Sequence, residues 1–277
     1  MVSEIDPQPV DMVVRNIAFE PGDAIKSDWI NANVFKSAFF NAMSVLFPYG
    51  EKSFIDSVRA LAPKIDDPKL AERVRAFISQ ESVHRREHHR FNEKLCDARG
   101  YDLDYLEKVV KAETSKIGET SDLTWLASTV AYEHLTSTIA HAILSEPSWL
   151  AGADPEIGRM WRWHAIEEIE HKSVAFDVYM AAGGSRGELR FMLVMMSIEF
   201  LSAYMWRNLA HMLMRSKAPF WSTFGEGAAF LFGRRGFFAS CWREYFSFFG
   251  KNFHPWNHDN RAVIDTAIRQ YGFAAAH

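Results

Sequence analysis

Two Glu-x-x-His motifs constrain the fold of this chain more than any other feature of its sequence. The first runs from Glu81 to His84 and the second from Glu168 to His171, and both lie in long stretches with helical periodicity. Positions i and i+3 share one face of an α-helix, so each motif presents a carboxylate and an imidazole together. One such motif arises often by chance. A pair on two long helices is typical of a four-helix bundle that holds two metal ions in its core.

A third histidine, His164, precedes the second motif by about one helical turn. On an ideal helix the side chains of His164, Glu168 and His171 fall within about 60° of arc over roughly two turns. This geometry leaves two interpretations open. His164 binds metal directly, or it lies just outside the ligands and orients one of them.

Helix-start and helix-stop residues divide the chain into four long helices that follow an N-terminal arm, residues 1–26. We expect them to begin at residue 27 or 28, at 68 after Asp-Asp, at 122, and at 155 after Asp. Their expected ends lie near residues 62, 98, 145 and 182, and a short helix with a loop connects the second and third helices. Pro48 should kink the first helix or open a local bulge, because proline lacks the backbone N–H.

The first and third helices each offer one candidate carboxylate. Glu51 follows Pro48 on an otherwise apolar face, and by itself it would be interpreted as a solvated helix residue. Glu133 is the only acidic residue inside the third helix, where its neighbours are small and apolar. The four helices then supply, in order, a carboxylate, a Glu-x-x-His motif, a carboxylate and a Glu-x-x-His motif. Separations of 30 and 35 residues within the two pairs fit antiparallel helices, and the separation of 52 between the pairs fits a crossover.

We therefore expect a dinuclear metal centre. Four carboxylates and two imidazoles can bridge two divalent ions, offset their charge and leave positions for dioxygen or water. Ligands that combine oxygen and nitrogen without thiolate favour iron or manganese over structural zinc. The expected cofactor is two iron ions, with a manganese–iron pair as the alternative, and no catalytic side chain is expected beyond the ligands. The predicted ligands are Glu51, Glu81, His84, Glu133, Glu168 and His171, with His164 as the seventh.

The competing interpretation is that the match is accidental. In that case Glu167, Glu168 and Glu170 would be solvated acids on the surface of the fourth helix. The two interpretations differ in burial, which the structure measures directly.

The last third of the chain, residues 185–277, is rich in aromatic residues and is expected to form a helical extension packed on the bundle of residues 27–184. A helix that is apolar nearly all round is expected over residues 188–216, but Arg190 and Glu199 are among the polar residues that interrupt it. It therefore lacks an uninterrupted apolar span of about 20 residues, and we favour burial against the bundle or in a homodimer interface over membrane insertion. The aromatic segment after it fits a lid over an apolar channel, an oligomer contact or an interfacial membrane patch.

Charge and cysteine content limit the classes of function. The net charge of −4 and the absence of a basic stripe argue against nucleic-acid binding. Cys96 and Cys241 are far apart in sequence, which suits a reducing compartment and suggests neither a disulfide framework nor a thiolate zinc site. Acidic residues and proline near the N-terminus do not fit a signal peptide. We expect a cytoplasmic protein, and peripheral membrane contact through the C-terminal region stays open.

The complete pattern resembles that of the ferritin-like di-iron oxygenases. The spacing of His164, Glu168 and His171 is similar to that in the arylamine N-oxygenases, where a third histidine on the last helix adds a seventh protein ligand. This resemblance implies that His164 binds metal here. The segments NAMSVLFPYGE, QESVHRREH, AYEH and WHAIEEIEHKSVAFDVY also resemble a bacterial family catalogued as predicted metal-dependent hydrolases, over roughly residues 20–270.

The predicted function is a di-iron oxygenase that uses dioxygen to oxidise an apolar or aromatic small molecule. Hydrolysis would need one activated water and a polar cradle for the substrate, whereas carboxylate-bound metals among aromatic residues suit oxygen activation. Electrons must come from an external donor, because the sequence has no flavin or nicotinamide fingerprint. The alternatives are a metal-dependent hydrolase and a non-catalytic iron-binding bundle. The aromatic extension weighs against the second of these, because cage-forming storage proteins need none.

Overall fold

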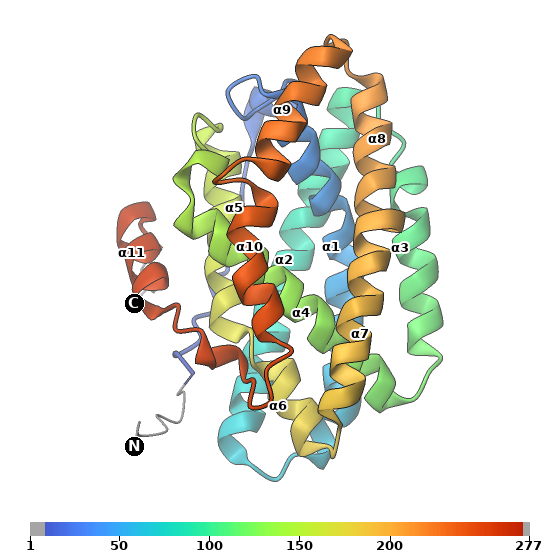
Figure 1. The fold of residues 1–277 in the computed structure, drawn as a ribbon, viewed down its shortest axis with the longest axis vertical. Coiled ribbons are helices and arrows are strands. Elements are labelled where there is room, and N and C mark those ends of the chain that lie inside the picture. Colours follow the sequence, from blue (N-terminus) through green and yellow to red (C-terminus); the bar gives the residue numbers. More distant parts are fainter. Residues whose placement is uncertain (1–8, 274–277) are drawn as a thin grey trace.

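The computed structural model describes residues 9–273, and within that range it contains helices and no β-strand (Figure 1). One isolated bridge pairs Ile30 with Ala153. The predicted all-α class is therefore confirmed. The α-helices are α1 (Val34–Leu61), α2 (Pro68–Arg99), α3 (Leu103–Gly118), α4 (Asp122–Ser145), α5 (Pro155–His171), α6 (Val174–Ala181), α7 (Arg186–Glu199), α8 (Trp206–Arg215), α9 (Phe220–Phe232), α10 (Phe237–Ser247) and α11 (Arg261–Tyr271). The shorter turns are η1 (Gly22–Lys26), η2 (Ala62–Lys64), η3 (Pro147–Trp149), the π-helical η4 (Phe200–Met205) and η5 (Pro255–Asn257).

Local sequence signals explain most helix ends. The carboxylate of Asp67 caps α2, which ends where Gly100 adopts a left-handed backbone with φ of 65°. The prediction for the start of α1 was wrong by several residues. Asn31 and Ala32 have positive φ angles, which a right-handed helix cannot contain, and Asn33 then caps the helix by accepting a hydrogen bond from the Lys36 N–H.

The predicted fourth helix is interrupted, which the sequence did not indicate. α5 ends at His171 and α6 begins at Val174. At the break, the ammonium group of Lys172 donates a hydrogen bond of 2.7 Å to the carbonyl oxygen of His258 in the C-terminal extension. A tertiary contact therefore accompanies the turn directly after the second Glu-x-x-His motif.

Pro48 leaves α1 continuous but changes its hydrogen bonding. Because proline has no N–H, the carbonyl group of Ser44 loses its helical donor. The side-chain amide of Asn92, on α2, replaces that donor at 2.9 Å. The proline therefore ties α1 to α2 through a side chain about two helical turns from Glu51.

Two apolar cores occupy the two ends of the bundle formed by α1, α2, α4 and α5–α6. Each of the four helical segments contributes residues to both cores, to one core in its first part and to the other core in its second part. Between the two parts, each segment has an interval without core residues. The core residues that bound the intervals are Leu46 and Phe54 in α1, Phe77 and Val83 in α2, Ala131 and Ile139 in α4, and Ile169 and Val174 in α5–α6. Four of the seven predicted ligands, Glu51, Glu81, Glu133 and His171, lie inside these intervals, and His84 and Glu168 directly adjoin two of them. The fold therefore leaves a polar layer between its two cores.

The C-terminal helices cover one side of this bundle. α7, η4 and α8 form one long rod that packs against α1 and α4, and α9 and α10 continue across the same face (Figure 1). Within the described residues, only segment 186–215 is both long and apolar enough to cross a membrane, judged by length and composition alone. Its most apolar window is only 28% buried. One side of this rod therefore packs on the bundle, and its other side is exposed in the single chain.

Candidate metal centre

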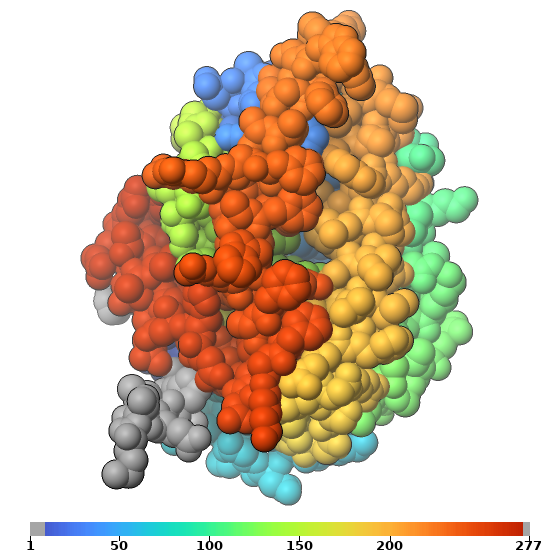
Figure 2. All heavy atoms as spheres, in the orientation of Figure 1, coloured from blue at the N-terminus to red at the C-terminus, as the bar shows by residue number. Residues whose placement is uncertain are grey.

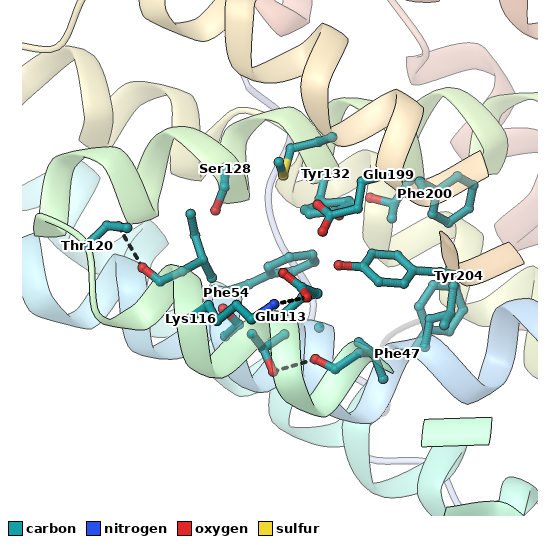
Figure 3. A pocket seen from close by; sticks show the side chains of 18 residues that line it. Phe47, Phe54, Glu113, Lys116, Thr120, Ser128, Tyr132, Glu199, Phe200 and Tyr204 are labelled. Atoms are coloured by element: carbon teal, nitrogen blue, oxygen red, sulfur yellow. Dashed lines mark hydrogen bonds and ion pairs between the residues drawn. The ribbon is translucent and has the colours of Figure 1, made fainter. Parts of the chain in front are cut away.

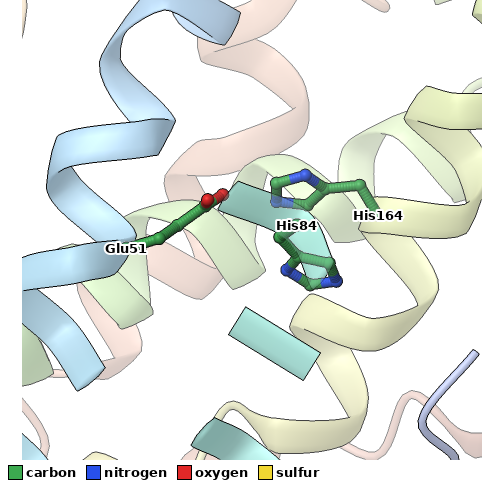
Figure 4. Close-up of side chains that lie close together, drawn as sticks. All are labelled: Glu51, His84 and His164. Carbon is green, nitrogen blue, oxygen red and sulfur yellow. The ribbon is translucent and has the colours of Figure 1, made fainter. Parts of the chain in front are cut away.

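All seven predicted ligands meet in the polar layer, and each is at most 3% exposed. Ligand atoms of Glu51, His84 and His164 lie within 4.8 Å of one another and form a first group, whose side chains converge from α1, α2 and α5 (Figure 4). Glu81, Glu168 and His171 form a second group by the same measure. Glu133 joins the second group from α4, where its Oε2 lies 3.4 Å from Nε2 of His171.

Nine ligand atoms in this layer have no hydrogen-bond partner among residues 9–273. They are both carboxylate oxygens of Glu51, Glu81 and Glu133, Oε2 of Glu168, Nδ1 of His84 and Nε2 of His171. Leaving so many buried polar atoms unpaired is strongly unfavourable unless a cation binds them. The donor set, oxygen and imidazole nitrogen without thiolate, fits two divalent metal ions of the iron or manganese type.

His171 is held by Gln80, its neighbour on α2. The Gln80 amide donates to the Val13 carbonyl at 3.0 Å and to Glu170 at 2.9 Å, so its oxygen can only accept. Nδ1 of His171 lies 3.1 Å from that oxygen and therefore carries the proton in the neutral imidazole. The other nitrogen, Nε2, is then a lone pair that faces the carboxylates of the second group.

His84 is held in the same way by Glu167. Nε2 of His84 donates to Glu167 Oε2 at 3.0 Å, which leaves Nδ1 facing Glu168 at 3.6 Å. An outer carboxylate that fixes the tautomer of a metal-binding histidine is a common arrangement in metalloproteins. Glu167, Glu168 and Glu170 are all buried, so the interpretation of these three as solvated surface acids is wrong.

A relay from Asn92 fixes the third imidazole. The Asn92 amide donates to the Ser44 carbonyl oxygen, so Asn92 Oδ1 must accept the hydroxyl proton of Ser44 at 2.7 Å. The Ser44 oxygen then accepts from Nδ1 of His88 at 2.8 Å, and Nε2 of His88 accepts from Nδ1 of His164 at 2.6 Å. Nε2 of neutral His164 is therefore a lone pair, although it lies 2.9 Å from Oε1 of Glu168.

Two facing lone pairs repel each other unless a proton or a metal ion is shared between them. Protonation is disfavoured, since burial and the charge of His84 lower the pKa of His164 to about 4. The relay therefore favours His164 as a ligand over His164 as an outer residue. Sequence alone left these two interpretations open.

The N-terminal arm supplies the positive charge behind the centre. The guanidinium group of Arg15 forms ion pairs with Glu167 at 3.2 Å and with Glu170 at 2.7 Å, and it is only 6% exposed. Glu167 in turn holds His84, and Glu170 holds Gln80 and thus His171. Arg15 therefore supports two ligands that it does not touch.

Five of the seven proposed ligands favour protonated forms in the absence of metal, whereas His164 and Glu168 favour deprotonated ones. Burial lowers the pKa of His84, but the neighbouring carboxylates of Glu167 and Glu168 outweigh it and raise the pKa to about 10. Burial and repulsion from Glu81 raise the pKa of Glu51 well above its ordinary value. Metal binding must therefore release protons, and its affinity should increase with pH.

We expect the metal-free protein to lose stability as the pH rises from 6.5 to 8.5. The stabilising contribution of His84 is complete below pH 6.5 and is lost as the pH rises through about 10, because its pKa is higher in the folded state. The loss should be on the order of 2–3 kcal/mol, or roughly 5–10 °C in melting temperature. Calorimetry of chelated and metal-loaded protein at both pH values measures this difference. A metal-free melting temperature that rises over this range would contradict the expectation.

Three apolar cavities share lining residues, and one of them borders the centre. The smallest, about 30 Å³, is bordered by His164 and Glu168. A cavity of about 260 Å³ lies between α1, α3, α4 and the α7–η4 segment (Figure 3). A cavity of about 300 Å³ lies between α4, the α7–η4 segment and α10. Phe200, the first residue of the π-helix η4, lines all three, and π-helical turns occur often at functional sites.

A further cluster of possible ligands, His141, Glu244 and His258, lies outside the central layer. It already contains a cation, because the ammonium group of Lys172 hydrogen-bonds to the His258 carbonyl and attracts the carboxylate of Glu244. Asn260 donates to His141 at 2.8 Å. We therefore assign no metal to this cluster.

Sequence reasoning did not identify the residues that orient the three imidazoles. They are Arg15, Ser44, Gln80, His88, Asn92, Glu167 and Glu170. A usable signal existed for some of them, since Gln80 adjoins the first motif and Glu167 and Glu170 flank Glu168. Arg15 gave no signal, because nothing in the sequence of the arm shows which helix it contacts.

Comparison with known proteins gives one match. A family model described as "predicted metal-dependent hydrolase" covers residues 13–259. Neither a curated protein nor a solved structure matches the chain. The ferritin-like topology and the likeness to arylamine N-oxygenases therefore stay predictions. The family's description supports the hydrolase alternative more directly than it supports the oxygenase.

Proposed function

The chain belongs to the family of predicted metal-dependent hydrolases, and on that premise we propose that it is a metal-dependent enzyme with two ions in its central polar layer. The proposed ligands are seven residues, namely the six residues of the two groups and Glu133. The nine unpartnered ligand atoms carry this proposal, because a buried set of carboxylates and lone-pair nitrogens is stable only around cations.

We propose dioxygen-dependent oxidation of an apolar substrate as the reaction. Two redox-active ions would supply the electron transfer to dioxygen, and an external donor would have to reduce them. The reacting atoms of the substrate would lie at the small cavity beside His164 and Glu168, which at about 30 Å³ has room for little more than those atoms. Its other lining residues are almost all apolar, including Met43 and Ile143. This lining excludes water from the reacting atoms and offers no polar cradle for an ester or phosphate.

Metal-dependent hydrolysis is the second candidate, because the description of the family names it. Two redox-inert ions in the same ligands would lower the pKa of a water molecule. The small cavity beside the centre offers few polar groups to hold a hydrolysable substrate, although Thr136 borders it. The apolar cavities beside the centre do not support the iron-storage alternative.

Oxygen consumption separates the two reactions. We expect the reduced, iron-loaded protein to consume about one dioxygen per two irons, measured with an oxygen electrode. Zinc-loaded protein should consume none and should not hydrolyse an aryl ester of a long-chain acid under anaerobic conditions. Anaerobic ester turnover by zinc- or manganese-loaded protein, without oxygen uptake by the iron form, would establish the hydrolase instead.

A further inference from the structure

The C-terminal helices present an extended apolar face to solvent. Of the 16 large apolar side chains that are exposed in the described residues, 14 lie between positions 191 and 246. Phe220, Trp221 and Phe232 are 69%, 78% and 73% exposed. Figure 2 shows the segments α7–α10 side by side across one face of the molecule. Exposed aromatic residues at this density mark an interaction surface.

The charges around this face are basic. Segment 186–251 contains nine Lys and Arg but four Glu, in a chain whose net charge is −4. None of the four acids is exposed: Glu188 accepts from Tyr179, Glu226 accepts from the Phe35 N–H, Glu199 accepts from Tyr132, and Glu244 is buried. Six of the nine cations are exposed, whereas Arg186, Arg190 and Arg207 are half-buried and donate to backbone carbonyl oxygens. Trp and Phe beside Lys and Arg are the composition of a surface that lies on anionic lipid.

The same charges disfavour a second copy of the chain as the occupant. A two-fold interface places one patch against itself, which would bring the basic side chains of both copies together. A membrane-spanning arrangement is also disfavoured. The rod from α7 to α8 packs on α1 and α4, so only its outer side is free for lipid.

A cavity opens on this face and leads toward the metal centre. Leu201, Trp242 and Phe246, which line the cavity of about 300 Å³, are themselves 43%, 52% and 61% exposed. Its inner wall includes Leu135 and the π-helical Phe200, which also line the small cavity beside His164 and Glu168. We propose that the α7–α10 face lies on an anionic lipid surface and that this cavity admits a long-chain acyl substrate from it. The substrate class rests on the proposed function of the centre, whereas the docking surface does not.

Vesicle flotation tests the docking surface. We expect the protein to float with phosphatidylcholine vesicles that contain phosphatidylglycerol, and replacement of Phe220, Trp221 and Phe224 by serine to weaken this binding at least tenfold. Val14→Ser removes an exposed apolar residue of the N-terminal arm, outside the face, and should bind like the unmodified protein. Melting curves of both variants verify folding. A protein that does not float with vesicles containing phosphatidylglycerol would overturn the proposal. A dimer that the triple variant dissociates would overturn it too.

Binding of a conjugated polyene fatty acid, followed by its fluorescence, tests the cavity. Leu135→Trp should fill the junction between the two cavities and weaken binding about tenfold, with flotation and metal content unchanged. Leu123→Trp adds the same bulk to a half-buried site on the same helix, away from the three cavities, and should bind the probe normally. Equal binding by both variants would refute the acyl route. If the protein binds metal but not vesicles, the inferred lipid surface is refuted and the proposed function is not affected. If the protein binds vesicles but no metal, only the proposed function is refuted.

Discussion

Replacing Glu81 with alanine should reduce the metal content from about two ions per chain to fewer than one. Both carboxylate oxygens of Glu81 lack a hydrogen-bond partner among the described residues, and Oε1 lies 3.1 Å from Nε2 of His171. The variant removes a ligand that reaches toward both groups and leaves the bound ions with one negative charge less. Metal analysis of protein purified after growth with iron gives the measurement.

Glu93→Ala is the matched control for this change. Glu93 is on the same helix, α2, but its side chain is 56% exposed and only approaches His89 at 3.5 Å. We expect this variant to keep both ions. The metal-free form of Glu81→Ala should melt no lower than the metal-free unmodified protein, because the change removes a buried group whose charged form burial disfavours. Two ions in Glu81→Ala, or equal loss in both variants, would contradict the proposed ligand set.

The sequence was sufficient to propose the seven ligands, because helical spacing is a local property. The residue pairs Glu81–His84 and Glu168–His171 share a face whatever the helix packs against, and burial of such a face is unfavourable without partners. Glu51 and Glu133 followed from the need for a carboxylate on each remaining helix. The all-α class followed from the same periodicity. None of these inferences required knowledge of the tertiary contacts.

The groups that orient the ligands depend on tertiary contacts and could not be derived in this way. The Ser44 carbonyl needs a new donor because of Pro48, but only the packing of α1 on α2 shows that Asn92 supplies it. The break between α5 and α6 accompanies a contact of Lys172 with a segment more than 80 residues later. The exposed side of the α7–α8 rod was also missed, since an apolar sequence does not distinguish a buried helix from one that faces lipid.

The N-terminal arm illustrates this limit most sharply, and its arginine gives the largest expected effect on stability. Arg15 is buried between Glu167 and Glu170, and its guanidinium group also donates to the carbonyl oxygens of Val13 and Phe273. Replacing Arg15 with methionine keeps much of its volume but leaves two buried carboxylates without their cation. Breaking a buried ion pair in this way typically costs about 3–5 kcal/mol.

We expect Arg15→Met to lower the free energy of unfolding by about 3–5 kcal/mol in a denaturant titration. Arg59→Met is the matched control, because Arg59 is 60% exposed and pairs with Asp56 at 3.4 Å, and it should change stability by less than about 1 kcal/mol. The Arg15 variant should also bind metal more weakly. Without the guanidinium group, Glu167 and Glu170 lose the contact that fixes their positions, and they then hold His84 and Gln80 less firmly. If Arg15→Met loses stability but binds metal with unchanged affinity, the arm only stabilises the fold. If it loses neither, the arm does not support the centre.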